Sequence, residues 1–336
     1  MRLKIEDIEK RLSTLYNLLD PCMLCPRKCG AKRLSGETGL CGGGFYPSVS
    51  ACLAHHGEEP PFSGSKGSGT VFFTGCSLGC VFCQNYQISR PQAVKSNEIS
   101  VEKLATYFIE LQKSGCHNLN LVTPTHFSAQ IVKALIIAIS NGFSLPVIWN
   151  SSGYESVEII NLLDGIVDIW LPDFKYMDPK AATLGSSAPD YPLVAQNAVS
   201  TMFTISGPLV TDDDGIAVSG LCVRHLVLPE NLSGSFEFLE WYAPFLADGA
   251  GISLMSQFNP PAGMPQSFAR SVTSDEYYPV AFELKCLNPE YAFIQDLTST
   301  NVFNPDFETT EVFDQAEFLL SNSDTKEVNL EKPFKK

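Results

Sequence analysis

Three cysteines, Cys76, Cys80 and Cys83, follow an apolar run at residues 70–73 with the spacing C-x3-C-x2-C. Each needs only a turn of chain to reach the next iron, so such spacings let three thiolates bind one cuboidal iron-sulfur cluster. The fourth iron then has no local protein ligand, and an open position can chelate a small molecule, as in catalytic zinc sites. A zinc knuckle or three buried thiols would also fit, although zinc normally takes a fourth ligand. The spacing therefore predicts a 4Fe-4S cluster with one open iron.

A second set of cysteines lies nearer the N-terminus, where Cys22, Cys25, Cys29 and Cys41 are spaced C-x2-C-x3-C-x11-C. Four thiolates within twenty residues can satisfy a tetrahedral zinc ion or a complete 4Fe-4S cluster, with no open position left. The same spacing is compatible with a redox-active pair or with four plain thiols. We predict a bound metal ion or cluster in this stretch, which we call the N-terminal module.

The elements that position the first set of cysteines alternate between strand and helix patterns from residue 70 onward, as in a parallel βα array. Between the first two strands a clear helix face begins at Val101, with Ser100 as its N-cap. An amphipathic helix is expected at residues 5–19, and a last helix and strand at about 273–286 and 291–297, with a loosely ordered tail beyond residue 306. The six predicted strands are at residues 71–74, 119–123, 147–150, 166–171, 223–228 and 252–256. Six units are too few for a closed eight-unit barrel.

Polar residues end five of the six predicted strands, where parallel βα arrays carry their reactive groups. A single one could be only a capping group, but the set favours a ligand site. These residues are Thr123, Thr125 and His126 after the second strand, Asn150 and Ser152 after the third, Asp173 and Lys175 after the fourth, Arg224 and His225 on the fifth, and Ser256 and Gln257 at the sixth.

The cysteine loop, with Phe82 before its last cysteine, resembles the signature of the radical S-adenosylmethionine (radical SAM) superfamily. The motifs at residues 80–85, 150–154, 173–175 and 224–229 are more narrowly similar to pyruvate formate-lyase-activating enzymes, in an uncharacterised branch that carries an N-terminal cysteine module. The resemblance covers roughly residues 20–305. It implies a partial (β/α)6 TIM-like barrel of the radical SAM type with an N-terminal cysteine-rich extension.

The resemblance also implies how a cofactor is held. The open iron would chelate the amino and carboxylate groups of S-adenosylmethionine, with the ring of Phe82 near its adenine. The family's Gly-Gly-Glu after the second strand is replaced here by Thr123-Pro124-Thr125, so Thr123, Thr125 or His126 would have to hold the methionine amino group. The implied cofactor contacts are Phe82, Gln84, Thr123, Thr125, His126, Asn150, Ser152, Asp173, Lys175 and His225.

The reaction that follows is reductive cleavage of S-adenosylmethionine to a 5′-deoxyadenosyl radical, which abstracts hydrogen from a substrate. Glycyl-radical formation on a partner enzyme is the activity that the resemblance suggests; modification of another peptide or a small molecule is also open. A rival class is an iron-sulfur electron carrier or a metal-bearing interaction protein. The cluster needs a low-potential donor such as a flavodoxin or ferredoxin, and the basic residues Arg27, Lys28, Lys32 and Arg33 are the predicted docking patch.

Composition limits the setting of the protein. A net charge of −14 over 336 residues argues against a general nucleic-acid surface. Because the sequence starts with charged residues, we expect no signal segment there. Because it has no run of 18 consecutive apolar residues, we expect no membrane-spanning helix. A reducing cytoplasm is the expected setting, and there the clustered cysteines among the eleven of the chain are expected to be metal ligands rather than disulfide partners. We expect three parts: residues 1–60 with a helix and the N-terminal module, residues 61–258 as the radical SAM core, and residues 259–336 as a C-terminal cap and tail.

Overall fold

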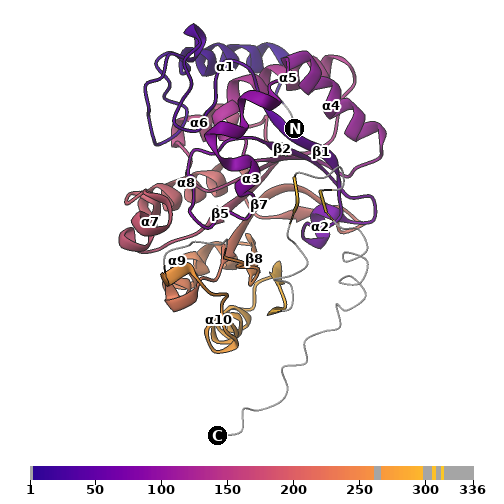
Figure 1. Ribbon diagram of the computed structural model, residues 1–336. Coiled ribbons are helices and arrows are strands. Elements are labelled where there is room, and N and C mark those ends of the chain that lie inside the picture. Colours follow the sequence, from indigo (N-terminus) through magenta and orange to yellow (C-terminus); the bar gives the residue numbers. More distant parts are fainter. Residues whose placement is uncertain (1–2, 261–265, 298–304, 308–311, 314–336) are drawn as a thin grey trace, which may run out of the picture.

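A single mixed sheet organises the chain (Figure 1), in a computed structural model that describes residues 3–260, 266–297, 305–307 and 312–313. The strand order is β1-β2-β3-β4-β5-β7-β8-β9, and the short β6 pairs with β7. All neighbours from β2 to β9 on this path are parallel, whereas β1 runs antiparallel at one edge. The strands are β1 (Val49–His55), β2 (Ser68–Phe73), β3 (Leu119–Val122), β4 (Val147–Ser151), β5 (Ile169–Phe174), β6 (Val210–Thr211), β7 (Ala217–Leu226), β8 (Gly251–Met255) and β9 (Ala292–Ile294).

Helices connect the strands and cover one face of the sheet (Figure 1), apart from the short α2, which packs on the other face. Helix α5 packs against α1 and α4, and α8 packs against α6 and β7. Ser100 caps α4 as predicted, because its hydroxyl accepts the backbone N–H of Lys103 at 3.1 Å. The helices are α1 (Ile5–Asn17), α2 (Pro60–Ser63), α3 (Tyr86–Ser89), α4 (Val101–Lys113), α5 (Ser128–Ser140), α6 (Val157–Leu163), α7 (Pro179–Ser186), α8 (Tyr191–Ser206), α9 (Ser235–Ala247) and α10 (Ser274–Cys286).

The six predicted strands are all present, as β2, β3, β4, β5, β7 and β8, and the predicted last helix and strand are α10 and β9. The parallel βα array is therefore confirmed. Strand β1 escaped prediction because its residues are mostly half-buried and show no clear alternation between apolar and polar positions. Most of the tail predicted beyond residue 306 lies outside the described residues.

Alternate residues of the strands face two different cores. In β5, Trp170 and Phe174 belong to the large core between sheet and helices, whereas Ile169 and Leu171 join a small cluster with Phe62 of α2 on the opposite face. We call this second face the inner face. Continuing the same alternation, Asn150 of β4 and Asp173 of β5 also lie on the inner face. The carboxyl end of the inner face is therefore polar, while its amino end is apolar.

Part of the chain near the C-terminus covers the inner face at β1 and β2. Gln87 of α3 donates to the carboxylate of Asp306 and accepts the backbone N–H of Phe307, both at 2.9 Å. The ring of Phe307 lies 5.2 Å from that of Phe72 in an edge-on arrangement. These contacts bring residues 306–307 beside the strand that leads into the cysteine loop.

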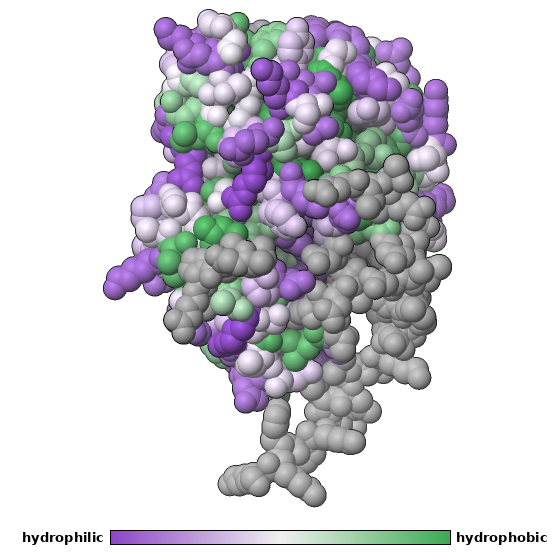
Figure 2. Space-filling view, viewed as in Figure 1, coloured by the Kyte–Doolittle hydropathy of each residue, from purple (hydrophilic) through white to green (hydrophobic). Residues whose placement is uncertain are grey.

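The face of the molecule in Figure 2 is dominated by polar and charged residues, with hydrophobic ones in small scattered patches. Within the described ranges, no helix combines the length and apolar character needed to cross a membrane.

Candidate iron-sulfur and cofactor site

The loop that carries Cys76, Cys80 and Cys83 follows β2 at the carboxyl edge of the sheet. Burial and, to a smaller extent, the nearby Cys80 and Cys83 sulfurs raise the pKa of the Cys76 thiol, the backbone N–H groups of Gly79 and Leu78 lower it by donating to the sulfur, and the net value is about 12. These N–H donors would stabilise a thiolate once a metal replaces the proton. The three thiols and their donors therefore suit an iron-sulfur cluster.

The C-terminal end of α7 supports this loop at Cys80. The hydroxyl of Ser186 donates to the sulfur of Cys80 at 3.1 Å and lies 2.7 Å from the hydroxyl of Tyr176. The backbone N–H of Val81 donates to the carbonyl of Gly185 at 2.8 Å. Burial raises the pKa of Cys80, against the charge of Lys175, which lowers it. Cys80 is thus a buried sulfur with a hydroxyl donor and an ammonium group close by.

Asp173 and Lys175, at the end of β5, form an ion pair of 2.7 Å, with side chains that are 23% and 15% exposed. Burial acts to lower the pKa of Lys175, but the charge and hydrogen bond of Asp173, together with the Cys80 and Tyr191 side chains, outweigh it and the pKa is raised, so the lysine stays protonated. The pair lies next to Cys80 and presents a cation and an anion together. Such a pair matches a zwitterionic ligand, with a carboxylate and an amino group, bound beside the cluster loop.

Thr123 and Asn150 meet at the ends of β3 and β4. The N–H of Thr123 donates to the carbonyl of Asn150 at 2.8 Å. Thr123 has a φ of +56°, in the left-handed region that a β-branched residue rarely occupies. Backbone strain of this kind concentrates at ligand sites, and here it falls where a cofactor contact was predicted.

The aromatic ring of Phe82 lies in a cluster rather than in open space. Its centroid is 5.1 Å from Phe268, 5.5 Å from Phe258 and 6.1 Å from Tyr176. Gln84, two residues on, is half-buried in the same loop. Ser152 is half-buried after β4, and its carbonyl accepts the hydroxyl of Tyr191 at 2.9 Å. These residues remain near the cluster loop or the strand ends where they were expected.

Three other predicted cofactor contacts, Thr125, His126 and His225, have side chains that are bonded to other parts of the protein. Thr125 is buried and donates to Glu155 at 2.5 Å. His126 is buried behind the sheet edge with its Nε2 2.8 Å from the carbonyl of Thr74, and burial lowers its pKa to about 4. Both belong to a 3-10 turn that precedes α5, and both side chains are bonded within the protein.

His225 points toward the helices, because it follows the inner-facing Arg224 and neighbouring strand residues point to opposite faces. Its Nδ1 lies 2.8 Å from the carbonyl of Phe174 and its Nε2 lies 2.9 Å from the hydroxyl of Ser235. It is fully buried and stacked on Phe238 at 4.2 Å. His225 therefore ties β7 to α9 rather than contacting a cofactor.

Arg224 has a structural role on the inner face. Its guanidinium donates to Glu58 and Glu59, which precede α2, with the Nε to Glu59 Oε1 distance at 2.8 Å. Burial favours the neutral form of Glu59, but the charge of Arg224 and the hydrogen bonds to the carboxylate together outweigh it and hold the pKa of Glu59 below its usual value. This ion cluster closes the inner face below the strand ends.

Glu155 is a buried carboxyl that sequence reasoning missed. Its Oε1 accepts from the hydroxyl of Thr125 at 2.5 Å and from Nε1 of Trp149 at 3.4 Å, while its Oε2 has no hydrogen-bond partner. Burial raises its pKa to about 7. The sequence offers only a weak signal, an acidic residue soon after a polar strand end.

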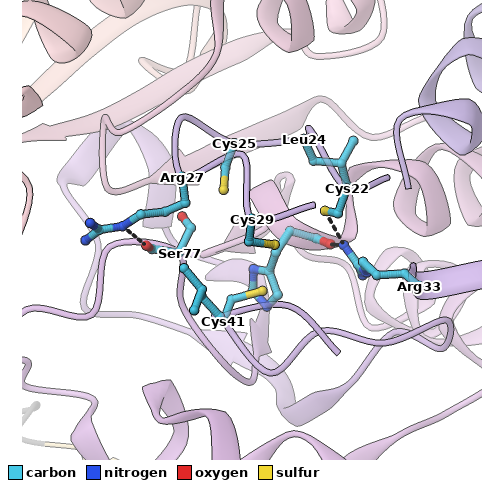
Figure 3. A pocket seen from close by; sticks show the side chains of 10 residues that line it. Cys22, Leu24, Cys25, Arg27, Cys29, Arg33, Cys41 and Ser77 are labelled. Carbon is cyan, nitrogen blue, oxygen red and sulfur yellow. Dashed lines mark hydrogen bonds between the residues drawn. The ribbon is translucent and has the colours of Figure 1, made fainter. Parts of the chain in front are cut away.

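The four cysteines of the N-terminal module line one cavity (Figure 3), together with Arg27, Arg33, Ser77 and His126. The N–H of Gly43 donates to the sulfur of Cys41 at 3.4 Å. The thiol of Cys25 is buried, which raises its pKa to about 12. Four thiols around one cavity, with a backbone donor directed at a sulfur, form a donor set that suits a metal-thiolate group.

Two arginines lie against this cavity, which corrects the predicted basic docking patch. Arg33 is fully buried and donates to the carbonyls of Gly44 (2.7 Å) and His126 (2.6 Å). The Arg27 guanidinium is likewise bonded to backbone carbonyls. Only Lys28 and Lys32 of the four cations are exposed. The prediction was wrong for the arginines because charge in a sequence does not reveal which way a side chain points.

Neither arginine forms an ion pair with a carboxylate in the part of the chain that the structure describes. A buried cation is costly unless an anion compensates it. Arg33 Nη1 lies 3.9 Å from the sulfur of Cys22, so a thiolate there would supply the missing charge. The described residues contain no group of three or more His, Cys, Asp or Glu side chains already gathered as a single metal ion needs. The fit to a metal-thiolate group therefore depends on these donors and charges.

Comparisons with known proteins bear on the first cysteine set. The family described as "4Fe-4S single cluster domain" matches residues 63–181, a range that contains Cys76, Cys80 and Cys83 and excludes the N-terminal module. "Uncharacterized protein MJ0674" from Methanocaldococcus jannaschii is 29% identical over 262 residues, which cover 75% of this chain and 70% of that protein.

Among solved structures, Streptococcus suis SuiB is similar at a TM-score of 0.45 and 7% identity, over 68% of this chain and 49% of SuiB. SuiB bound to S-adenosylmethionine is similar at a TM-score of 0.45 and 8% identity, over 67% of this chain and 50% of that one. The matches thus span about half the length of SuiB, and a likeness this distant assigns neither fold nor function.

Proposed function

We propose that this chain is a radical SAM enzyme, with a partial (β/α)6 barrel as its fold. The observation that carries the proposal is the arrangement at the carboxyl edge of the sheet, where the three-cysteine loop lies beside the Asp173–Lys175 ion pair. The match of residues 63–181 to a 4Fe-4S single cluster domain supports it. When bound, a reduced cluster with an open iron supplies the electron that cleaves S-adenosylmethionine to methionine and a 5′-deoxyadenosyl radical.

The residues of the chain have distinct tasks in this proposal. Cys76, Cys80 and Cys83 hold three irons. Lys175 and Asp173 bind the carboxylate and the amino or hydroxyl groups of S-adenosylmethionine by charge-assisted hydrogen bonds. The aromatic cluster around Phe82 excludes water from the radical, which must meet only its substrate.

The finer proposals concern the reaction, the partners and the second site. We infer that the radical acts on a glycine of a partner enzyme or on another peptide, and that a flavodoxin or ferredoxin supplies the electron in the cytoplasm. Cys22, Cys25, Cys29 and Cys41 hold a second cluster or a zinc ion, and their thiolates supply the negative charge that compensates the buried Arg33.

The test is release of 5′-deoxyadenosine from S-adenosylmethionine by the anaerobically reconstituted, dithionite-reduced protein, measured by mass spectrometry. Cys80→Ser should bind less iron and release none. Cys286→Ser is the matched control, because Cys286 is an exposed cysteine at the end of α10. Full turnover by Cys80→Ser would refute the radical reaction, and a reducible cluster without any product in the wild-type protein would favour an electron carrier.

The second site is tested by elemental analysis of the same preparation. A Cys25→Ser, Cys29→Ser double variant should lose the iron or zinc of the module while the iron at the first site is counted separately by its SAM-sensitive paramagnetic signal. Unchanged metal content in this variant would show that the module binds none.

A further inference from the structure

The N-terminal module and the cluster loop pack directly against each other. Ser77, the residue after Cys76, lines the cavity of the module. Gly75, at the start of the cluster loop, has a φ of +81°, and a Cβ there would lie 2.3 Å from the carbonyl oxygen of Cys41. Only glycine permits so close an approach with that backbone conformation. The two cysteine sets are therefore joined backbone to backbone.

Arg27, which lies between Cys25 and Cys29, extends this contact with its side chain. Its Nε donates to the carbonyl of Ser77 at 3.1 Å, and its Nη2 donates to that of Leu78 at 3.0 Å. The same guanidinium donates to the carbonyls of Ser186 (2.7 Å) and Ser187 (2.6 Å) at the end of α7. Its CZ atom lies 5.4 Å from the ring centroid of Tyr154, which fixes its plane.

These four carbonyls belong to the two segments that carry and support Cys80. Ser77 and Leu78 lie within the chain between Cys76 and Cys80, and Ser186 also donates its hydroxyl to the sulfur of Cys80. Arg27 thus holds both the loop that carries the ligand and the helix end that supports it. A planar guanidinium with five donors can satisfy four carbonyls at once, which a lysine ammonium with three donors cannot.

We propose that Arg27 is a positioning residue that makes the order of the Cys76–Cys83 loop depend on the group held by the N-terminal module. The inference rests on the proposed function in taking both cysteine sets to bind metal. When Cys25 and Cys29 are tied to a common group, the backbone between them is fixed and Arg27 is held in place. When they are free, that segment relaxes and Arg27 releases the cluster loop.

The test compares Arg27→Ala and Arg27→Lys with Lys32→Ala, which removes an exposed cation of the same module. The measurements are the rate at which a chelator removes iron from the first site, and the change in the paramagnetic signal of the reduced cluster when S-adenosylmethionine is added. We expect Arg27→Ala to lose that iron about tenfold faster, since a hydrogen bond to a charged group contributes roughly a factor of ten or more. Arg27→Lys should fall between it and the wild type, and Lys32→Ala should match the wild type.

The dependence on the module is tested by a double-mutant cycle with Cys29→Ser. Cys29→Ser alone should accelerate iron loss from the first site, and adding Arg27→Ala to it should have little further effect. The inference would be overturned if the two substitutions accelerated iron loss additively, or if Arg27→Ala retained iron as well as Lys32→Ala does. If Arg27→Ala does not fold, the same two comparisons are made with Arg27→Lys. These readouts need no cleavage of S-adenosylmethionine, so a wild-type protein that binds both groups but makes no 5′-deoxyadenosine would refute the proposed reaction and leave this inference standing.

Discussion

Glu155 should make the stability of the protein fall as the pH rises toward neutrality. Its carboxyl is 2% exposed, its Oε2 has no partner, and burial raises its pKa from 4.5 to about 7. Above pH 4.5 the carboxyl of the unfolded chain loses its proton, while the folded carboxyl keeps its proton until about pH 7. Ionisation therefore favours the unfolded state across this window.

The size of the effect follows from the shift. A rise from 4.5 to about 7 corresponds to a loss of roughly 3 kcal/mol of unfolding free energy between those two pH values, with no further loss above them. Glu155→Gln keeps the carbonyl oxygen that accepts from Thr125 and Trp149 but cannot ionise. An unpartnered amide nitrogen in the variant would cost about 1–3 kcal/mol at every pH. The decisive quantity is therefore how the stability changes with pH, and not its absolute value.

The assay is the melting temperature of wild-type protein and Glu155→Gln between pH 5 and pH 8. The melting temperature of Glu155→Gln minus that of the wild type should increase with pH up to about pH 7 and then stay constant. Infrared spectroscopy of the folded protein supplies a direct check, because the protonated carboxyl stretch should disappear near the same pH in the wild type and be absent from the variant. Glu158→Gln, which removes an exposed carboxylate on α6, is the matched control. Parallel pH curves for wild type and Glu155→Gln would refute the assignment of a neutral buried carboxyl.

Three further substitutions probe the site. Thr123→Gly should relieve left-handed backbone strain of about 1–2 kcal/mol and add a glycine entropy cost of about 0.5–1 kcal/mol, so the melting temperature should stay equal or rise slightly while S-adenosylmethionine binds more weakly. The control is Asn288→Gly, at an exposed residue that also has a positive φ, and unchanged affinity in Thr123→Gly would show that the strain serves no ligand. Asp173→Asn should weaken S-adenosylmethionine binding in calorimetry with little change in melting temperature, whereas equal losses in both would identify the pair with Lys175 as structural. Gly75→Ala should destabilise the protein by about 2–4 kcal/mol and lower the metal content of both cysteine sets, because it adds a Cβ 2.3 Å from a carbonyl oxygen in a positive-φ position. A wild-type melting temperature and metal content would contradict the close packing of the two sets.

Local sequence determined the parts of this protein that depend on short distances along the chain. The spacing of Cys76, Cys80 and Cys83 places three thiols on one loop whatever surrounds it. Apolar runs and helix faces predicted the six parallel strands, and the cap at Ser100 followed from a single residue and its neighbours. Periodicity and spacing are enough here because each depends on contacts only a few residues apart.

Tertiary structure alone decided which polar groups share a site. The side chains of Arg27 and Arg33 point inward because they donate hydrogen bonds to carbonyls far along the chain, including those of Ser186 and His126. A local sequence pattern cannot predict such distant acceptors. The direction of His225 toward the helices depends on strand register, since a shift of one position would have placed it on the inner face. The pKa of Glu155 is raised because the packed core removes water from its carboxyl, and that burial is a property of the assembled fold.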